Sequence, residues 1–318
     1  MARTHEPRDW AWNWQKEGLV FSLDEDDWME THAQLPVATQ VEGDRYRVYI
    51  AGRNSDNMSQ VGYVEIDVTD PTERLDAAPE PVIELGALGT FDDSGVFPSS
   101  VVQAGEETRL YYVGWMRGDR VPYYACVGLA VSTDGGRTFE RHSRGPLLPR
   151  TDVDPYMTLS SCVRHESGQW RMWYTSATGW EAREDGPRPN YHIRYAESDN
   201  GLDWRREGTV CIDYATEDEW AIAAPCVRRI GNGYAMWYSY VRGHDGYRMG
   251  YATSPDGVAW TRRDDAVGLD VSSEGWDAEM TAYPNVFEHD GTWYMLYNGN
   301  DYGERGFGLA TVEGGPTP

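Results

Sequence analysis

The chain has 318 residues, of which 40% are hydrophobic and 13% aromatic, and its formal net charge is −24 with a pI near 4.6. This excess of acidic groups argues against nucleic acid or an anionic membrane as a partner. The first residues carry no apolar core of the signal-peptide type, and no stretch approaches membrane-spanning length. We therefore expect a cytoplasmic protein.

The first predicted element is a strand at residues 14–21. Its Trp14, Lys16, Glu17, Gly18 and Val20 match the segment from Trp204 to Val210 in residue type and spacing. The later segment follows a complete set of strands, whereas the chain ends without such a segment. We predict that the N-terminal strand supplies the missing outermost strand at the C-terminal end.

Five copies of one pattern follow: an apolar run with aromatic residues, a strand of the Gly-x-Ala-x-Ser type and a turn of the Ser-x-Asp-x-Gly type. A spacing of roughly 50 to 65 residues in an all-strand sequence is typical of radial sheet repetition. We predict an all-β, five-bladed β-propeller with four-stranded antiparallel blades. The apolar runs lie at Arg47–Ile50, Leu110–Tyr112, Met172–Tyr174, Met236–Tyr238 and Met295–Tyr297.

The pattern covers nearly the whole chain, so we expect a single domain over residues 1–318. Residues 14–21 form the outer strand of the last blade. The five blades are predicted at approximately residues 28–86, 91–150, 154–213, 218–271 and 276–313.

The Ser-x-Asp-x-Gly turns, at Asp134 and Asp256 among others, are predicted to be structural. An Asp in such a hairpin accepts hydrogen bonds from its own turn, and Gly takes the left-handed position. These turns resemble the Asp-boxes of sialidase-type propellers. The four cysteines have no C-x-x-C spacing, so we expect buried free thiols and no metal site built on them.

Residues just before the first strand of each blade would line a central funnel. Aligned on Pro36, Pro98, Ser161, Pro225 and Pro284, each of these five approach segments carries at least one carboxylate. Converging carboxylates would shift one another's pKa values and attract a cation or a polyhydroxylated ligand. The candidate catalytic residues are Asp93 and Glu279 as the main pair, Glu219 and Asp154 as further acids, and His32 as a proton carrier or orienting group.

The second strands end at the same face and add arginines, amides and aromatic rings, which suit a sugar ligand. An alternative is that the arginines only neutralise the acids at the rim. The candidate substrate-binding residues are Arg53, Trp115, Arg117, Arg242, Tyr283, Asn298 and Asn300.

The sequences MWYSY at 236–240, YRMGYATSPDGVAW at 247–260 and YMLYNGNDYGERGFGLA at 294–310 resemble the five-bladed propeller glycosidase superfamily. This superfamily includes arabinanases, invertases and mannoside phosphorylases, and the likeness extends over residues 14–313. The closest resemblance is to bacterial glycosidase-like propellers. It implies a hydrolase-like role in carbohydrate metabolism, with a small sugar or glycoside as ligand.

The chain departs from that superfamily at one point. Its hydrolases typically place an Asp directly before the first-strand proline, where this chain has Leu35, Phe97, Ala224 and Tyr283, with Ser160 before Ser161. Two functions stay open: a glycoside-active enzyme that uses funnel carboxylates, and a non-hydrolytic sugar-binding or biosynthetic protein. We expect no cofactor, although an axial Ca²⁺ held by oxygen ligands stays open. The sugar and the oligomeric state are not indicated.

Overall fold

The computed structural model describes residues 11–23, 29–243 and 246–314, so Trp28 at the predicted start of the first blade lies outside the described residues. The described chain is almost entirely β. Beyond the strands it has a short helix, α1 (Asn300–Gly303), and a 3₁₀ turn at Asp264–Ala266. None of the described helices is long and apolar enough to cross a membrane.

The strands are separated by Gly- and Asp-containing turns. In chain order they are β1 (Gln15–Phe21), β2 (Thr31–Glu42), β3 (Arg45–Arg53), β4 (Ser59–Asp67), β5 (Asp70–Ala77), β6 (Gly95–Ala104), β7 (Glu107–Arg117), β8 (Tyr123–Ser132), β9 (Glu140–Arg141), β10 (Thr158–Glu166), β11 (Gln169–Glu181), β12 (Arg188–Ser198), β13 (Val210–Ile212), β14 (Glu219–Ile230), β15 (Gly233–Arg242), β16 (Arg248–Ser254), β17 (Thr261–Arg262), β18 (Ala282–His289), β19 (Thr292–Asn298) and β20 (Phe307–Glu313).

The described strands form one four-stranded and two eight-stranded sheets. Each eight-stranded sheet consists of two antiparallel sets of four strands, joined by a single parallel residue pair. These pairs are Ser59 with Gly95, between β4 and β6, and Tyr191 with Ala221, between β12 and β14. Sheets of four to eight strands are consistent with the predicted propeller, but only one of them is a separate four-stranded blade as predicted. The difference arises because the next inner strand starts beside the third strand of the preceding set.

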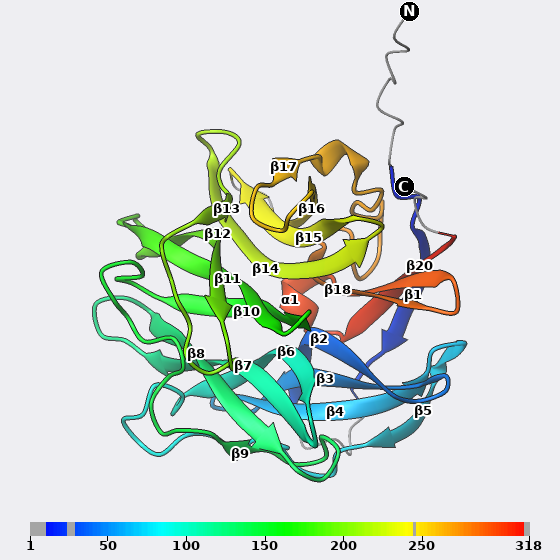
Figure 1. Ribbon diagram of the computed structural model, residues 1–318, viewed down its shortest axis with the longest axis horizontal. Coiled ribbons are helices and arrows are strands. Elements are labelled where there is room, and N and C mark those ends of the chain that lie inside the picture. Colours follow the sequence, from blue (N-terminus) through cyan, green and yellow to red (C-terminus); the bar gives the residue numbers. More distant parts are fainter. Residues whose placement is uncertain (1–10, 24–28, 244–245, 315–318) are drawn as a thin grey trace, which may run out of the picture.

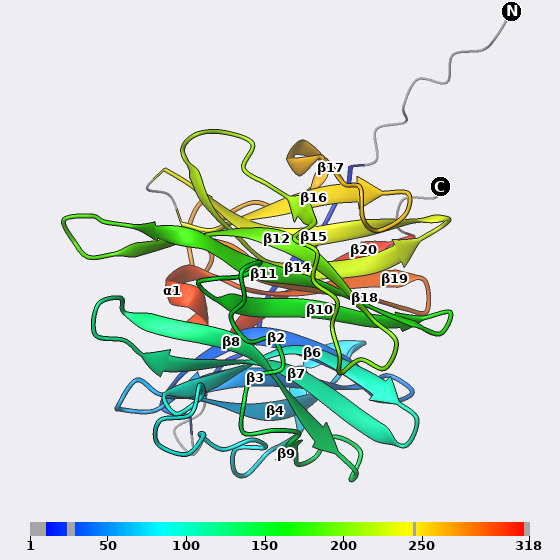
Figure 2. The ribbon, with the colours of Figure 1, turned by 60° about the vertical axis from the view of Figure 1, so that its left-hand side comes forward.

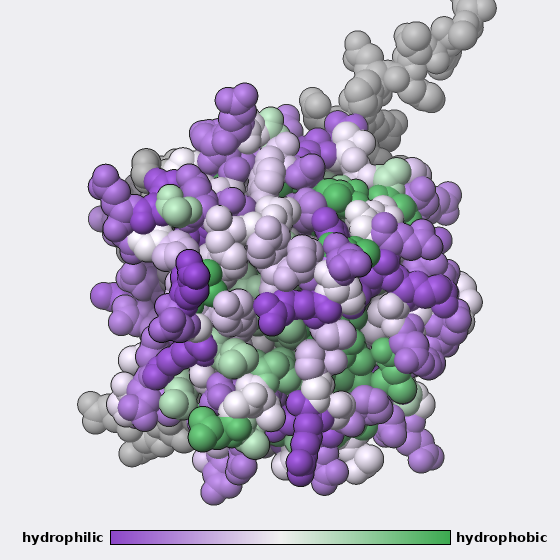
Figure 3. All heavy atoms as spheres, turned by 90° about the vertical axis from the view of Figure 1, so that its left-hand side faces the viewer, coloured by the Kyte–Doolittle hydropathy of each residue, from purple (hydrophilic) through white to green (hydrophobic). Residues whose placement is uncertain are grey.

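The innermost strands contact one another in a closed cycle: β2 with β6, β6 with β10, β10 with β14, β14 with β18, and β18 with β2. Figure 1 shows these strands around the centre of the molecule, with α1 among them. In Figure 2 α1 lies toward one face, where the inner strands begin. We call this face the entrance face. The flank in Figure 3 is mostly hydrophilic, with small separate apolar areas.

The second strand of each set is buried on both sides because it packs between neighbouring sets of strands. This explains its continuous apolar run in place of strict alternation. Leu110, Tyr111 and Tyr112 of β7 are fully buried, as are Met236, Trp237 and Tyr238 of β15.

The N-terminal strand β1 pairs antiparallel with β20, the last strand of the chain, and the order in that sheet is β1-β20-β19-β18. The prediction that the N-terminus supplies the outermost strand of the last set is confirmed. Trp12 and Trp14, just before β1, pack against Trp237, and Trp12 also contacts Trp293. The two ends of the chain are therefore joined by both hydrogen bonds and aromatic packing.

Three buried aspartates tie an outer segment to the second strand of their own set. Each accepts a hydrogen bond from the tyrosine 20 residues later and pairs with a cation from an outer segment. We call this arrangement a clasp. The clasps are Asp92 with Tyr112 (3.0 Å) and Arg141 (2.7 Å), Asp154 with Tyr174 (3.0 Å) and Arg206 (2.9 Å), and Asp277 with Tyr297 (3.0 Å) and Lys16 (2.6 Å).

The Ser-x-Asp-x-Gly turns are hydrogen-bonded internally, as predicted. Asp134 accepts the backbone N–H groups of Arg137 and Thr138. The turn also docks on the preceding set: Tyr49 of β3 donates its hydroxyl to the carbonyl oxygen of Gly136, at 2.7 Å. Gly136 has φ of 81°, and a Cβ at this position would collide with that hydroxyl. The turn therefore also joins neighbouring sets of strands.

Candidate functional site

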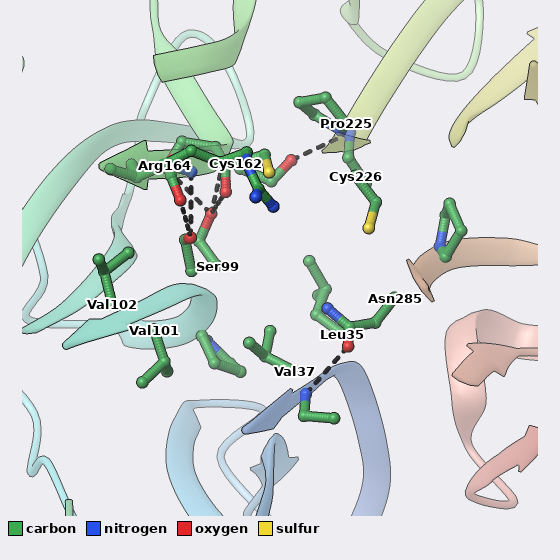
Figure 4. Close-up of a pocket in the computed structure, with 18 of the residues that line it drawn as sticks. Leu35, Val37, Ser99, Val101, Val102, Cys162, Arg164, Pro225, Cys226 and Asn285 are labelled. Carbon is green, nitrogen blue, oxygen red and sulfur yellow. Dashed lines mark hydrogen bonds between the residues drawn. The ribbon is translucent and has the colours of Figure 1, made fainter. Parts of the chain in front are cut away.

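The five inner strands surround a cavity of about 310 Å³ on the axis. In Figure 4, Leu35, Cys162, Pro225 and Asn285, which come from four different inner strands, lie around this cavity. The sequence alignment on the prolines is thus reproduced in space. All five residues that precede the aligned positions line the cavity or pack in the apolar cluster at the end of the cavity where the inner strands begin, which we call its mouth: Leu35, Phe97, Ser160, Ala224 and Tyr283.

The backbone is strained at three of these positions. Leu35, Ala224 and Tyr283 have φ of 51°, 54° and 58°. Left-handed backbone is costly for residues other than Gly, and it persists only where surrounding contacts hold it. Here the N–H of each residue donates to a side chain of a neighbouring set: Leu35 to Asn298 (2.9 Å), Ala224 to Ser160 (3.1 Å) and Tyr283 to Ser239 (2.8 Å).

Tyrosines gather at the mouth of the cavity, on the entrance face. We call them the tyrosine cluster. The hydroxyls of Tyr123 and Tyr191 lie 2.6 Å apart, and the ring of Tyr247 lies 5.8 Å from that of Tyr283 and 6.1 Å from that of Tyr302. Tyr283 also lines the axial cavity, which connects the cluster to it. The cluster consists of Tyr123, Tyr191, Tyr247, Tyr283 and Tyr302, and every set of strands after the first contributes to it.

The first set of strands contributes Arg53 and His32 to the same mouth. Arg53 ends β3, and its guanidinium lies 5.5 Å from the ring of Phe97 and interacts electrostatically with Tyr283. Its Nε donates to Oε1 of the buried Gln34 at 2.9 Å. Burial, followed by the positive charge of Arg53, lowers the pKa of His32, so its ring is mainly neutral at pH 7.

Burial keeps most of the tyrosine hydroxyls protonated, because a phenolate is poorly solvated there. A neutral hydroxyl can both donate and accept a hydrogen bond, which suits the hydroxyl groups of a polar ligand. The tyrosines whose pKa is raised by burial are Tyr123, Tyr191, Tyr247 and Tyr283.

Two of the predicted acids, Asp154 and Glu219, are held in ion pairs. Asp154 is fully buried in its clasp and also pairs with Arg194 at 3.2 Å. Glu219 pairs with Arg262 at 2.7 Å and Arg242 at 3.1 Å. Burial opposes ionisation of Glu219, but the hydrogen bonds from Arg262 and the Ala215 N–H prevail and lower its pKa. Both groups are therefore carboxylates already occupied by the protein's own cations.

The predicted main pair, Asp93 and Glu279, has different surroundings. Asp93 is half-buried and accepts hydrogen bonds from the Gly89 N–H (2.9 Å) and the Ser94 hydroxyl (2.8 Å). Glu279 is exposed, and its backbone bonds to Asn300 and Arg248. Neither carboxylate forms an ion pair with any residue that the structure describes. Their role as a catalytic pair stays a prediction.

The predicted binding residues divide into two groups. Arg53, Trp115 and Tyr283 belong to or adjoin the mouth of the cavity, where Trp115 stacks on Phe97 at 6.5 Å. The others are engaged in contacts within the protein. Asn298 bridges Ala33, Leu35 and Gly306, Asn300 binds the backbone at Gly275, Glu279 and Met280, Arg242 pairs with Glu219, and Arg117 donates to the carbonyl oxygen of Asp56.

Sequence reasoning missed most of the tyrosine cluster. A signal was present, since Tyr191 and Tyr247 each stand five residues before the Ala of the repeated strand, at Ala196 and Ala252. Tyr123 is displaced by two residues from that position, and Tyr302 lies in the α1 turn with φ of 57°. Tyr123 and Tyr191 belong to third strands, outside the approach segments and second strands on which the predicted site was based.

The axial cavity does not fit Ca²⁺. Calcium takes six to eight oxygen ligands, usually with several carboxylates. The residues that line the described cavity include no Asp or Glu, and their charged side chains are Arg164 and Arg228. The axial Ca²⁺ that the sequence left open therefore has no suitable set of ligands in this cavity.

No family model matches the chain. The "Uncharacterized protein MT1551" of Mycobacterium tuberculosis (strain CDC 1551 / Oshkosh) is 41% identical over 302 residues, which cover 94% of this chain and 99% of the relative. A solved structure described as "Glycoside hydrolase" is similar with a TM-score of 0.74 and 18% identity, over 95% of this chain and 92% of that one. Another, a complex of BT0996 and RGII, gives 0.73 and 18%, with the same coverage. The resemblance to glycosidase-like propellers is confirmed at the level of the fold, and this protein belongs to the same family as the Mycobacterium tuberculosis protein.

Proposed function

We propose that this protein is a five-bladed propeller that binds a sugar or a sugar-containing intermediate at the tyrosine cluster. The observation that carries the proposal is the convergence of tyrosine hydroxyls and aromatic rings on the mouth of the axial cavity. Rings that stack on the faces of a sugar, beside hydroxyls that bind its edges, are a common means of carbohydrate recognition. The glycoside hydrolase and the RGII complex among the structural neighbours support the same ligand class.

The five-bladed arrangement is supported by the closed cycle of inner strands and by the pairing of β1 with β20. If the single parallel pairs are set aside, each antiparallel set has four strands. Such a ring buries both faces of every blade. The single-domain boundaries and the cytoplasmic location remain proposals.

We favour a non-hydrolytic role in carbohydrate metabolism. Asp154 and Glu219 are tied up by arginines, and the positions before the aligned prolines carry no carboxylate. A glycosidase needs one protonated and one ionised carboxyl group beside the scissile bond. Hydrolysis by Asp93 and Glu279 is the second candidate, because these two acids have no cation bound in the described chain.

Binding and turnover separate the two candidates. Tyr283→Phe removes one hydroxyl from the cluster and should weaken binding of its sugar about three- to tenfold, the scale of one lost hydrogen bond. Tyr294→Phe is the matched control, since Tyr294 stacks on Phe287 in another apolar cluster and lies outside the tyrosine cluster. Calorimetry with common monosaccharides, their uronates and their 1-phosphates provides the measurement. Equal affinities for both variants and the native protein would reject the proposed site.

For the second candidate, Asp93→Asn and Glu279→Gln should each lower turnover of aryl glycosides by at least about a hundredfold while the protein stays folded. A carboxyl separation of about 6 to 10 Å would then imply inversion. Full activity of both variants would reject a catalytic pair made of these residues.

A further inference from the structure

Arg53, at the entrance face, has uncharged hydrogen-bond partners. Its Nε donates to Gln34, and its Nη1 donates to Oδ1 of Asn57 at 2.7 Å. Nη2 donates no hydrogen bond to any residue within 11–23, 29–243 or 246–314. The guanidinium therefore offers free donors at the mouth of the cavity.

Three other arginines near this face have carboxylate partners, whereas Arg117 donates to a backbone carbonyl oxygen. Arg242 pairs with Glu219 at 3.1 Å, Arg188 with Glu181 at 2.5 Å and Arg248 with Asp270 at 3.6 Å. Asp and Glu outnumber Lys and Arg by 24 in this chain, so acidic partners are plentiful. A half-buried arginine without one is costly, because its desolvation is not offset by an opposite charge.

The pKa shifts of Arg53 and Arg242 have opposite directions, in keeping with their different partners. Burial lowers the pKa of Arg53, whereas the hydrogen bond to Glu219 raises the pKa of Arg242. The buried amide of Gln34 and the ring of Phe97 fix the guanidinium in place. His32 and Tyr283, which both interact electrostatically with Arg53, have φ of 65° and 58°, so strained backbone surrounds this group. Strain that persists beside an unpaired charge is typical of a functional site.

We propose that Arg53 binds the anionic group of the sugar, either the carboxylate of a uronic acid or the phosphate of a sugar phosphate. The inference rests on the proposed sugar site and specifies its substrate class. A guanidinium fork matches the oxygens of both anions and forms charge-assisted hydrogen bonds with them. The tyrosine hydroxyls would bind the sugar's own hydroxyls, while Arg53 selects the charged form.

The test compares each neutral sugar with its charged derivatives by calorimetry. Glucose and galactose are titrated beside glucuronate, galacturonate and the two sugar 1-phosphates, with inorganic phosphate and acetate as sugar-free probes. We expect one charged derivative to bind at least about tenfold more tightly than its neutral parent. Arg53→Gln should abolish this preference and change the affinity for the neutral parent less than about twofold. Arg53→Lys should retain part of it.

Arg205→Gln is the control for net charge, because Arg205 is 53% exposed and pairs with Asp199 at 2.8 Å. It should keep the full preference. The charged derivative that binds more tightly than its neutral parent, a uronate or a sugar 1-phosphate, identifies the anionic group. A neutral parent that binds as tightly as its charged derivatives, or a preference that survives Arg53→Gln, overturns the inference and leaves the sugar site intact. Inorganic phosphate binding as tightly as a sugar phosphate also overturns it. If none of these sugars binds the native protein, the proposed sugar site fails as well.

Discussion

The carboxylate of Asp154 lies 2.9 Å from the guanidinium of Arg206 and joins an outer segment to the innermost approach of the same set. Asp154 is completely buried, and Arg194 and Tyr174 bind it too. Asp154→Asn should therefore lower the free energy of unfolding by about 3 to 5 kcal/mol, since it leaves buried cations without a counter-charge.

Urea unfolding measures this loss. Asp152→Asn makes the same chemical change two residues away at an exposed position and should cost less than about 0.5 kcal/mol. Equal stability of the two variants would mean that the clasp contributes nothing and that Asp154 is free for another role.

Asp134 should stabilise the protein through its turn. Asp134→Ala removes hydrogen bonds to Ser132, Arg137 and Thr138 and should lower stability by about 1 to 2 kcal/mol, with no change in ligand affinity. Asp119→Ala, at an exposed position, is the control. A selective loss of ligand binding at unchanged melting temperature would instead make the turn part of the site.

The same residue gives a pH dependence. Burial opposes ionisation of Asp134, but the hydrogen bonds from Ser132 and Thr138 outweigh it and lower the pKa to about 2. A carboxyl group with a depressed pKa in the folded state stabilises the protein above its unfolded pKa of about 3.9, and this contribution is lost as the pH falls toward 2. The stability difference between native protein and Asp134→Ala should thus shrink between about pH 4 and pH 2. A constant difference across this range would contradict the assignment.

The N-terminal strand should be essential for stability. Deletion of residues 1–21 removes β1, Lys16 and the two tryptophans that pack on Trp237, and it exposes the edge of β20. We expect a large fall in melting temperature and aggregation through the open edge. Removal of residues 314–318 should have little effect. Scanning calorimetry and gel filtration compare the two, and a stable monomer after the first deletion would contradict the closure.

Much of the fold could be predicted because it depends on local pattern. The aromatic runs, the Ser-x-Asp-x-Gly turns and the match between Trp14–Val20 and Trp204–Val210 each specify a strand or a turn within one repeat. The joining of two sets into one sheet could not be predicted. It depends on a single residue pair such as Tyr191 with Ala221, which no repeat pattern encodes.

The site was harder to predict because the sequence does not show which charged residues pair with one another in the fold. Asp154 and Asp93 look alike in sequence, yet the first is held by arginines that lie 40 and 52 residues away in the chain. Arg53 and Arg242 follow equivalent strands, but only Arg242 meets a carboxylate. The tyrosines lie close together because the inner strands form a closed cycle. The residues next to the aligned prolines, with Arg53 and Trp115 of the second strands, could be placed there from sequence.

The most direct test of the account is a crystal structure of the protein soaked with the uronates and sugar 1-phosphates named above. We predict density for a sugar ring among Tyr247, Tyr283 and Tyr302, with its anionic group within hydrogen-bond distance of Arg53. A sugar bound elsewhere on the molecule, with the tyrosine cluster unchanged, would contradict the account.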